Sequence, residues 1–197
     1  MIGIFSAFGA TLSWTYACSI WRTQTYIYKP IEINFLKNVI AFIIFSPVIL
    51  FFNFSIHYKY FLILFLSGII GIGLGDTFYL KSLNLIGTRK TLSIECLSPL
   101  IAAITGTLFI DDQLNINAWI GIVIVTGALI KIIRKESYLL DKNSKLVINN
   151  NSLDKYIYAL LSVFCAVIAA LLSRIVLLES DLTPIFTTEM RLFGSII

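Results

Sequence analysis

Seven long stretches almost free of charge, separated by short polar intervals, constrain this chain more than any other feature. A helix needs about 20 apolar residues to cross a bilayer. The stretches are residues 1–21, 38–58, 60–80, 91–110, 113–130, 156–178 and 184–197. They are apolar on every side, whereas membrane strands alternate apolar and polar residues over about 10 positions. The sequence therefore predicts an all-α, multi-pass bundle of transmembrane helices in contact with the lipid bilayer.

The composition supports this class and excludes two others. Charged residues make up 13% of the chain, about half the share found in soluble domains of this size. The formal charge of +4 does not indicate nucleic-acid binding, because the basic residues lie between apolar stretches and form no basic stripe. Residues 1–21 lack the basic start of a secretory signal peptide, so we interpret them as a retained first span.

The distribution of Lys and Arg predicts an orientation. Twelve of the fifteen fall in the intervals after the first, third and fifth stretches. They are Arg22, Lys29, Lys37, Lys81, Arg89, Lys90, Lys131, Arg134, Lys135, Lys142, Lys145 and Lys155. Since positive charge stays in the cytoplasm, we expect this face to be cytoplasmic and the N-terminus to lie outside, in a membrane of bacterial plasma-membrane type.

An internal repeat is indicated by two matching positions. The first and sixth stretches are each followed by a proline with a basic residue seven positions later, Pro30 with Lys37 and Pro184 with Arg191. Five spans separate the copies, so the second enters the membrane in the opposite sense. Inverted repeats of this kind are typical of transporters, whose binding site lies near the midplane.

The repeat predicts three parts of the chain. Residues 1–133 would be a first five-helix unit, 134–155 a polar cytoplasmic linker, and 156–197 the first two helices of a second unit. We therefore expect an inverted 5+5 arrangement with a truncated second unit, about seven helices in all. Either the sequence is a fragment, or a partner chain completes the second unit.

Two carboxylates within the apolar stretches, Asp76 and Glu95, are the sharpest chemical signal. Such a group costs about 2.5–3.5 kcal/mol at membrane depth, so it usually faces the protein interior and has a function. A hairpin turn near Ile86 would bring both to similar depth. They would then share a proton or bind a substrate amine. The alternative is a salt bridge to Lys81, Arg89 or Lys90, and both interpretations remain open.

Residues near the two carboxylates suggest how a cavity could form. Gly71 and Gly75 make a G-x-x-x-G face that lets a second helix approach closely. Pro99 removes the helical donor for the carbonyl of Glu95, which predicts a hinge or a simple kink. Trp14 and Tyr79 would line a cavity for an amphipathic solute, or would only pack as aromatic side chains at the membrane interface.

The sequence holds no sign of an enzyme. The cysteines Cys18, Cys96 and Cys165 are widely spaced and the single histidine, His57, has no neighbouring ligands, so no metal site is expected. The Gly-rich run at 71–75 lacks the spacing and the preceding strand of a phosphate loop. We expect no cofactor and no catalytic residues.

The chain resembles the EamA-type ten-helix members of the drug/metabolite transporter superfamily. The resemblance is carried by a first-helix tryptophan, a Gly-rich third helix with an aromatic and a lysine, a proline in the fourth helix, an acidic turn and a Gly-containing fifth helix. In this chain these are Trp14; Gly71, Gly73 and Gly75; Tyr79 and Lys81; Pro99; Asp111 and Asp112; Gly121 and Gly127. The acidic turn departs from the usual Gly-Glu, and Lys37 and Arg191 stand where arginine is common.

This resemblance implies a permease that transports a small metabolite across the membrane by alternating access. If the two carboxylates have a function, we expect it to be proton coupling or cation recognition. We expect Trp14, Asp76, Tyr79 and Glu95 to bind the substrate. Two other classes stay open: a non-transporting or truncated membrane component, and a membrane-embedded lipid-modifying enzyme. The enzyme would need a cluster of polar residues at one membrane face, which only Asp76 and Glu95 approach.

Overall fold

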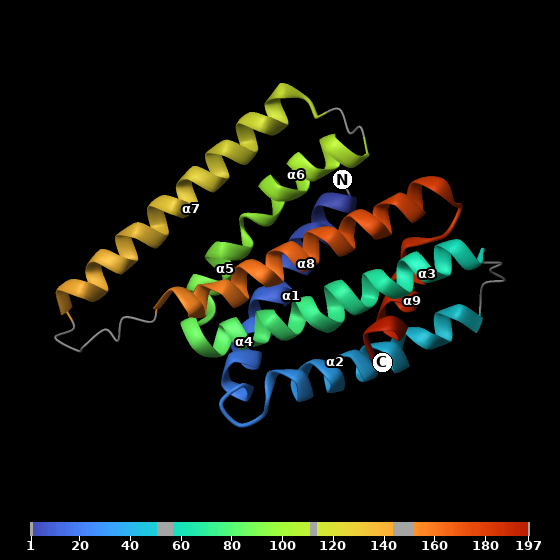
Figure 1. Cartoon of the computed structure of the whole chain (residues 1–197), viewed down its shortest axis with the longest axis horizontal. Helices are drawn as coiled ribbons and strands as arrows, with labels where there is room; N and C mark the ends of the chain where they lie inside the picture. The colour runs from blue at the N-terminus through green and yellow to red at the C-terminus, as the bar shows by residue number, and fades with distance from the viewer. Residues whose placement is uncertain (1, 51–56, 111–113, 144–151, 197) are drawn as a thin grey trace.

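The computed structural model describes residues 2–50, 57–110, 114–143 and 152–196, and every regular element within these ranges is helical. The prediction of an all-α bundle is confirmed (Figure 1). In chain order the elements are α1 (Ile2–Gln24), α2 (Pro30–Leu50), α3 (Tyr58–Ser67), η1 (Gly68–Gly75), α4 (Asp76–Ile86), α5 (Thr88–Glu95), α6 (Ser98–Phe109), α7 (Ile116–Asn143), α8 (Ser152–Glu179) and α9 (Pro184–Ile196).

The described elements form seven helical segments, because α3, η1 and α4 follow one another without a gap and α5 is separated from α6 by only two residues. Four segments are long and apolar enough to cross a bilayer by length and composition: Pro30–Pro47, Tyr58–Ile86, Thr88–Phe109 and Lys155–Glu179. Large apolar side chains are exposed on several outer faces, for example Phe8, Ile44 and Val123. In a bilayer such faces contact lipid tails.

A tight turn at Gly87 joins the third and fourth segments, close to the predicted turn at Ile86. Gly87 has φ +82°, a left-handed conformation that only glycine adopts without strain. Its N–H donates to the carbonyl of Leu83 at 3.1 Å and closes the end of α4. Across the hairpin the Ser82 hydroxyl lies 3.2 Å from that of Thr91. The two segments therefore run back along each other.

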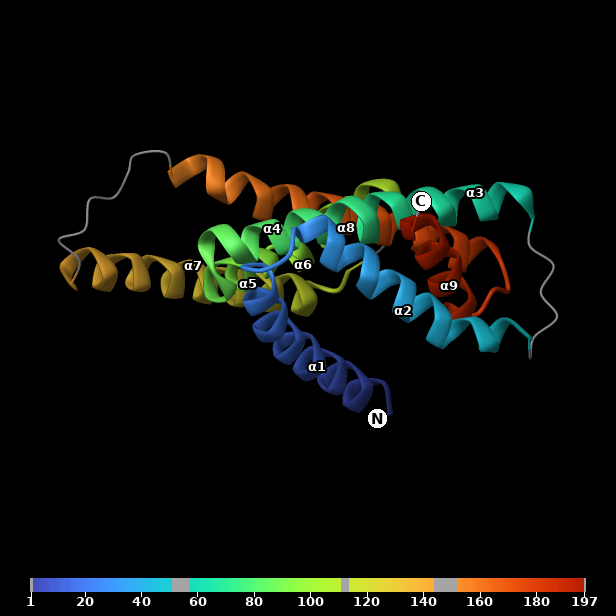
Figure 2. The same ribbon diagram turned by 90° about the horizontal axis from the view of Figure 1, so that it is seen from below.

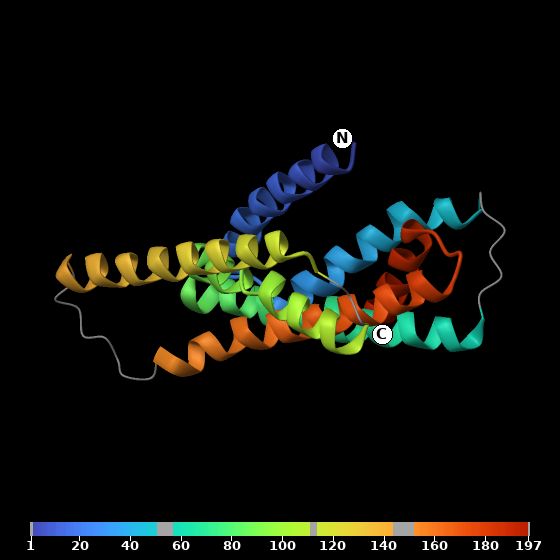
Figure 3. The same ribbon diagram turned by 90° about the horizontal axis from the view of Figure 1, so that it is seen from above.

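Helix α8 is the central element of the bundle. It lies beside the α3–η1–α4 segment and runs in the opposite direction (Figure 1). Helices α2 and α9 pack on one side of this pair, and α5 and α6 pack against α8 on the other. Helix α1 contacts α4 and α5 near its C-terminal end and leaves the bundle obliquely toward the N-terminus (Figure 2). Helix α7 lies at the outer edge (Figure 3).

The third segment contains an eight-residue π-helical stretch, η1, rich in glycine. Its wider turn shows in the bond from the N–H of Asp76 to the carbonyl of Gly71, five residues earlier. The amide of Asn34 on α2 donates to the carbonyls of Ile72 and Gly73, both at 2.8 Å. A side chain from a neighbouring helix therefore donates hydrogen bonds to backbone carbonyls of the irregular turn.

Two boundaries differ from the sequence-based expectation. Helix α2 begins at Pro30 rather than at Asn38, because proline is well suited to the first turn of a helix, where its missing N–H is not needed. Lys37 therefore lies within a helix and not in a loop, which corrects its assignment. Helix α7 runs to Asn143 and α8 begins at Ser152, so both extend into the expected linker. Asp111 and Asp112 lie outside the described residues.

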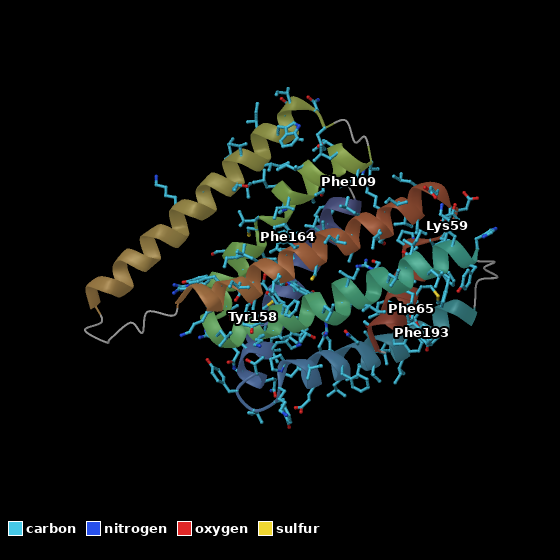
Figure 4. The ribbon with its side chains drawn as sticks, in the orientation of Figure 1. Lys59, Phe65, Phe109, Tyr158, Phe164 and Phe193 are labelled. Carbon is cyan, nitrogen blue, oxygen red and sulfur yellow. The ribbon has the colours of Figure 1, made fainter. Side chains whose placement is uncertain are left out.

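Aromatic and polar contacts tie the segments together at the end of the bundle where α3 begins. The Nζ of Lys59 lies 3.2 Å from Oε2 of Glu179 at the end of α8. Phe65 of α3 packs against Phe193 of α9 with ring centroids 6.0 Å apart (Figure 4). Phe193 also contacts Phe42 of α2 at 6.0 Å. These contacts hold α9 between α2 and α3.

Candidate functional site

A cavity of about 810 Å³ opens between α1, α5, α6 and α8. Its volume is within the range of about 300–1,000 Å³ usual for small-molecule sites. It is lined by Ala10, Thr11, Trp14, Thr15, Leu92, Glu95, Cys96, Ser98, Pro99, Ala102, Ala166, Val167 and Ala170. Among these residues only Glu95 carries a formal charge. The cavity thus combines an apolar wall with one carboxylate.

Glu95 reaches the cavity because the helix breaks directly after it. It is the last residue of α5, and Pro99, the second residue of α6, has no N–H to donate to the Glu95 carbonyl. The chain turns through Cys96 and Leu97, where the N–H of Leu97 bonds instead to the carbonyl of Ile94 at 2.9 Å. The predicted disturbance at Pro99 is present as this break. Pro99 itself lines the cavity.

The Glu95 carboxylate lies beside neutral groups. The indole N–H of Trp14 and the hydroxyl of Tyr79 lie near enough to interact with it. No ion pair joins it to a basic side chain within the described part of the chain. Its charge is therefore not neutralised by these parts of the protein.

Tyr79 lies behind the cavity wall and attaches α1 to α4. It is 2% exposed, and its hydroxyl is 2.9 Å from the Sγ of Cys18 on α1. Its ring centroid is 5.7 Å from that of Trp14, which in turn makes an edge contact with Trp21 at 5.4 Å. Tyr79 thus packs against the Trp14 ring, which lines the cavity, although Tyr79 does not line the cavity itself.

Asp76, the first residue of α4, has a different environment from Glu95. It forms an ion pair with Lys37 of α2, and about a quarter of each side chain is exposed. The alternative considered from the sequence, a salt bridge to Lys81, Arg89 or Lys90, is not the pairing found. The two carboxylates are near enough to interact electrostatically, but Asp76 does not line the cavity.

The other lysines of the hairpin lie over aromatic rings of α8. The Nζ of Lys81 is 3.9 Å from the ring centroid of Tyr158, and that of Lys90 is 5.9 Å from Tyr156. Both are cation–π distances. These side chains therefore turn toward the outer end of α8 and away from the carboxylates.

A second cation, Arg191 of α9, also lies near Asp76. Its guanidinium is close to Gly71, where a Cβ would lie 3.4 Å from its Nη2, and its Nε is buried without a hydrogen-bond partner. Lys37 and Arg191 each stand seven residues after the proline that begins their helix. The two positions matched in the internal repeat thus converge on one carboxylate.

Gly71 and Gly75 form the surface that α8 approaches. A Cβ at Gly71 would overlap the Cβ of Ala169, and one at Gly75 would lie 3.2 Å from the Cβ of Cys165. The hydroxyl of Ser67, one turn earlier, donates to the carbonyl of Ala169 at 2.8 Å. Because the residues on this face are small, α8 can pack closely against it.

Three buried polar residues were missed from the sequence. Asn34 supports η1 but leaves its Oδ1 without a partner, and Asn38 and Glu189, each 1% exposed, have no hydrogen-bond partner for their side-chain atoms. The two asparagines lie one turn apart on α2, and this spacing is visible once the helix is started at Pro30. Glu189 lies within an apolar stretch like Asp76 and Glu95, and the same criterion would have found it.

The described residues contain no group of three or more His, Cys, Asp or Glu side chains placed to hold a metal ion. Cys18, Cys96 and Cys165 are free thiols.

Comparison with protein-family models matches residues 1–134 to the model described as the EamA-like transporter family. The match covers more than half of the 197-residue chain. A search of curated proteins and a search of solved structures found no match.

Proposed function

The chain belongs to the EamA-like transporter family, and from this premise we propose that it moves a small metabolite across the membrane through the cavity between α1, α5, α6 and α8. The observation that carries the proposal is a cavity of about 810 Å³ with a single charged residue, Glu95, in a wall that is otherwise neutral and mostly apolar. Sites for small molecules have this pattern, in which a few polar groups orient a ligand held by apolar contacts.

Glu95 and Trp14 are the substrate-contacting residues in this proposal. Glu95 supplies the charge, and the neutral side chains of Trp14 and Tyr79 lie beside it. Trp14 offers a ring face at the cavity. Because the described residues place no cation against Glu95, this carboxylate is available to a substrate or to a proton. A transported solute or coupling ion can be released only if its counter-charge is not permanently paired.

Asp76 and Tyr79 act beside the cavity and not within it. Tyr79 positions Trp14 and Glu95. Asp76 joins α4 to α2 through its ion pair with Lys37. Arg191 of α9 is a second cation that interacts electrostatically with Asp76. An exchange of Asp76 between these partners would accompany the relative movement of α2 and α9 during alternating access.

In this proposal Pro99 is the hinge between α5 and α6. The break at Cys96 and Leu97, where Pro99 removes one helical bond, is the point at which α6 would tilt relative to α5. A tilt of α6 would widen or close the cavity, since Pro99 and Ala102 form part of its wall. Helix α8 supplies the opposite wall through Ala166, Val167 and Ala170.

Uptake into proteoliposomes tests the proposal. The purified chain is reconstituted, and the initial uptake of labelled amines, amino acids and nucleosides is compared with that of protein-free liposomes. We expect uptake of at least one solute, and a loss of about tenfold or more in Glu95→Gln, because a charged partner is removed. Glu179→Gln is the matched control, since Glu179 lies in an exposed ion pair at the end of α8.

Two outcomes would contradict the proposal. If no solute entered faster than into protein-free liposomes, transport through this chain would be rejected. If Glu95→Gln transported as fast as Glu179→Gln, the cavity would not be the pathway.

A further inference from the structure

We propose that the cavity selects an amine with an apolar body and without a carboxylate or phosphate group, so that amino acids and nucleotides are excluded. This inference rests on the proposed function, because it names the substrate class of the same cavity.

The charge balance of the cavity favours a monocation. Among the described residues that line the cavity, only Glu95 is charged. Two lysines of the same hairpin, Lys81 and Lys90, lie over the rings of Tyr158 and Tyr156. Lys37 is paired with Asp76. A zwitterion would place its ammonium at Glu95 and its carboxylate against an uncharged wall, where an unpaired charge is strongly unfavourable.

The hydroxyl groups of the wall also favour an ammonium over an anion. The hydroxyl of Thr11 donates to the carbonyl of Ala7, and that of Thr15 to the carbonyl of Thr11, both at 2.9 Å. A hydroxyl that has donated its hydrogen can offer only its oxygen. The indole N–H of Trp14 lies beside Glu95. The hydroxyls of Thr11 and Thr15 can accept hydrogen bonds from an ammonium but have no hydrogen left for an anion. Ser98 and Cys96, the other polar side chains among the described lining residues, carry no positive charge to balance an anion.

The remaining wall specifies an apolar body. Most of it is formed by aliphatic side chains, among them Ala10, Ala102, Ala166, Val167 and Ala170. The Trp14 side chain is 36% exposed, and tryptophan is the best aromatic partner for a cation. An ammonium between Glu95 and the Trp14 ring, with its hydrocarbon part along the alanines, satisfies each of these groups.

Binding of four matched ligands tests the inference without requiring transport. The probes are 2-phenylethylamine, phenylalanine, 3-phenylpropionate and 2-phenylethanol, which share a phenyl group and a short chain but differ in charge. Displacement of radiolabelled 2-phenylethylamine from the purified full chain in detergent gives their relative affinities. We expect the amine to bind about tenfold or more tightly than each of the other three, as expected for one charge-assisted bond.

Substitutions at Glu95 and Glu179 assign the preference to the cavity. Glu95→Gln should lose the advantage of the amine over the alcohol, Glu95→Asp should keep part of it, and Glu179→Gln should keep all of it. Circular dichroism and gel filtration check that each variant is folded. Should Glu95→Gln not fold, the Trp14→Phe variant, which retains a ring but no N–H, is expected to weaken amine binding severalfold.

The outcomes separate this inference from the proposed function. Phenylalanine binding as tightly as the amine, or an amine preference unchanged in Glu95→Gln, would overturn the inference and leave transport of another solute intact. Selective amine binding that depends on Glu95 would support it, even if proteoliposomes took up no amine, in which case transport alone would fail.

Discussion

Asp76 and Glu95 are alike in the sequence but differ in the partners that the fold gives them. Both are carboxylates within apolar stretches, on either side of the same turn. Asp76 has Lys37 as a counter-charge, whereas Glu95 has the neutral donors Trp14 and Tyr79. Desolvating a paired charge costs much less than desolvating an unpaired one. The first carboxylate is thereby suited to holding helices together, and the second to meeting a solute.

Removal of Lys37 should destabilise the protein because it leaves Asp76 without its ion-pair partner. We expect Lys37→Met to lower the melting temperature in detergent, and the double variant Lys37→Met with Asp76→Asn to recover part of the loss. The coupling energy from the four-variant cycle should be about 1–3 kcal/mol in favour of the native pair. A coupling energy near zero would show that Arg191 replaces Lys37 fully.

At the scale of elements, the glycine-rich stretch η1 explains how α8 can occupy the centre of the bundle. Its glycines face different neighbours: Gly68 lies against the backbone of Arg191, Gly71 lies against Ala169, and a Cβ at Gly73 would meet no atom closer than 3.7 Å. Close approach is therefore required at some of these positions and not at others.

This difference predicts the outcome of alanine substitutions. Gly71→Ala should cost about 1–3 kcal/mol, because its methyl group would overlap the Cβ of Ala169 and push α8 outward. Gly73→Ala is the matched control in the same π-helical stretch and should cost much less. Thermal unfolding in one detergent, followed by circular dichroism, measures both. Equal melting temperatures for the two variants would argue against close packing of α8 at Gly71.

Structural features that depend on residues close together in the sequence could be predicted, and features that depend on distant residues could not. The turn at Gly87 and the break before Pro99 depend on neighbouring residues, and both are expected from the sequence. The start of α2 is misplaced by a criterion based on uncharged stretches, because Lys37 interrupts one. The charge of Lys37 is tolerated inside the helix because it pairs with Asp76, 39 positions away in the sequence. A partner so distant cannot be detected from the residues around Lys37.

The candidate site was predictable in part for the same reason. Trp14 and Glu95 were expected at a cavity and do line one, together with Pro99. Asp76 and Tyr79 were expected there too, but each is turned toward another helix by one contact, with Lys37 and Cys18 respectively. Depth in the membrane can be read from spacing along the sequence, whereas the direction of a side chain around the helix depends on the neighbouring helices.

At the scale of the whole molecule, α2 and α9 begin with the matched prolines Pro30 and Pro184 and pack against each other. Phe42 contacts Phe193, while Ile31 and Asn34 share a smaller cavity with Ser195 and Ile196. The early part of α2 therefore faces the late part of α9, and the two helices run antiparallel. That direction is what an inverted repeat requires.

The two ends of the bundle differ in charge, and this difference predicts which end faces the cytoplasm. The end formed by the α1–α2 turn and the α4–α5 turn holds Arg22 and Lys29 together with Arg89 and Lys90, and the two turns are tied by the bond from Asn84 to the carbonyl of Thr25 at 2.8 Å. At the opposite end Lys59 is paired with Glu179. Positive charge is retained on the cytoplasmic side, so the first end should be inside.

Single cysteines report this orientation directly. In a variant whose three native cysteines are replaced by alanine, Tyr28→Cys marks the basic end and Asp181→Cys marks the other, both at exposed positions. A maleimide that cannot cross membranes should label Asp181→Cys in intact cells and Tyr28→Cys only after permeabilisation. The reverse pattern would place the N-terminus in the cytoplasm, and the positive charge of the α1–α2 and α4–α5 turns would then need a cause other than topology, such as binding of anionic lipid headgroups.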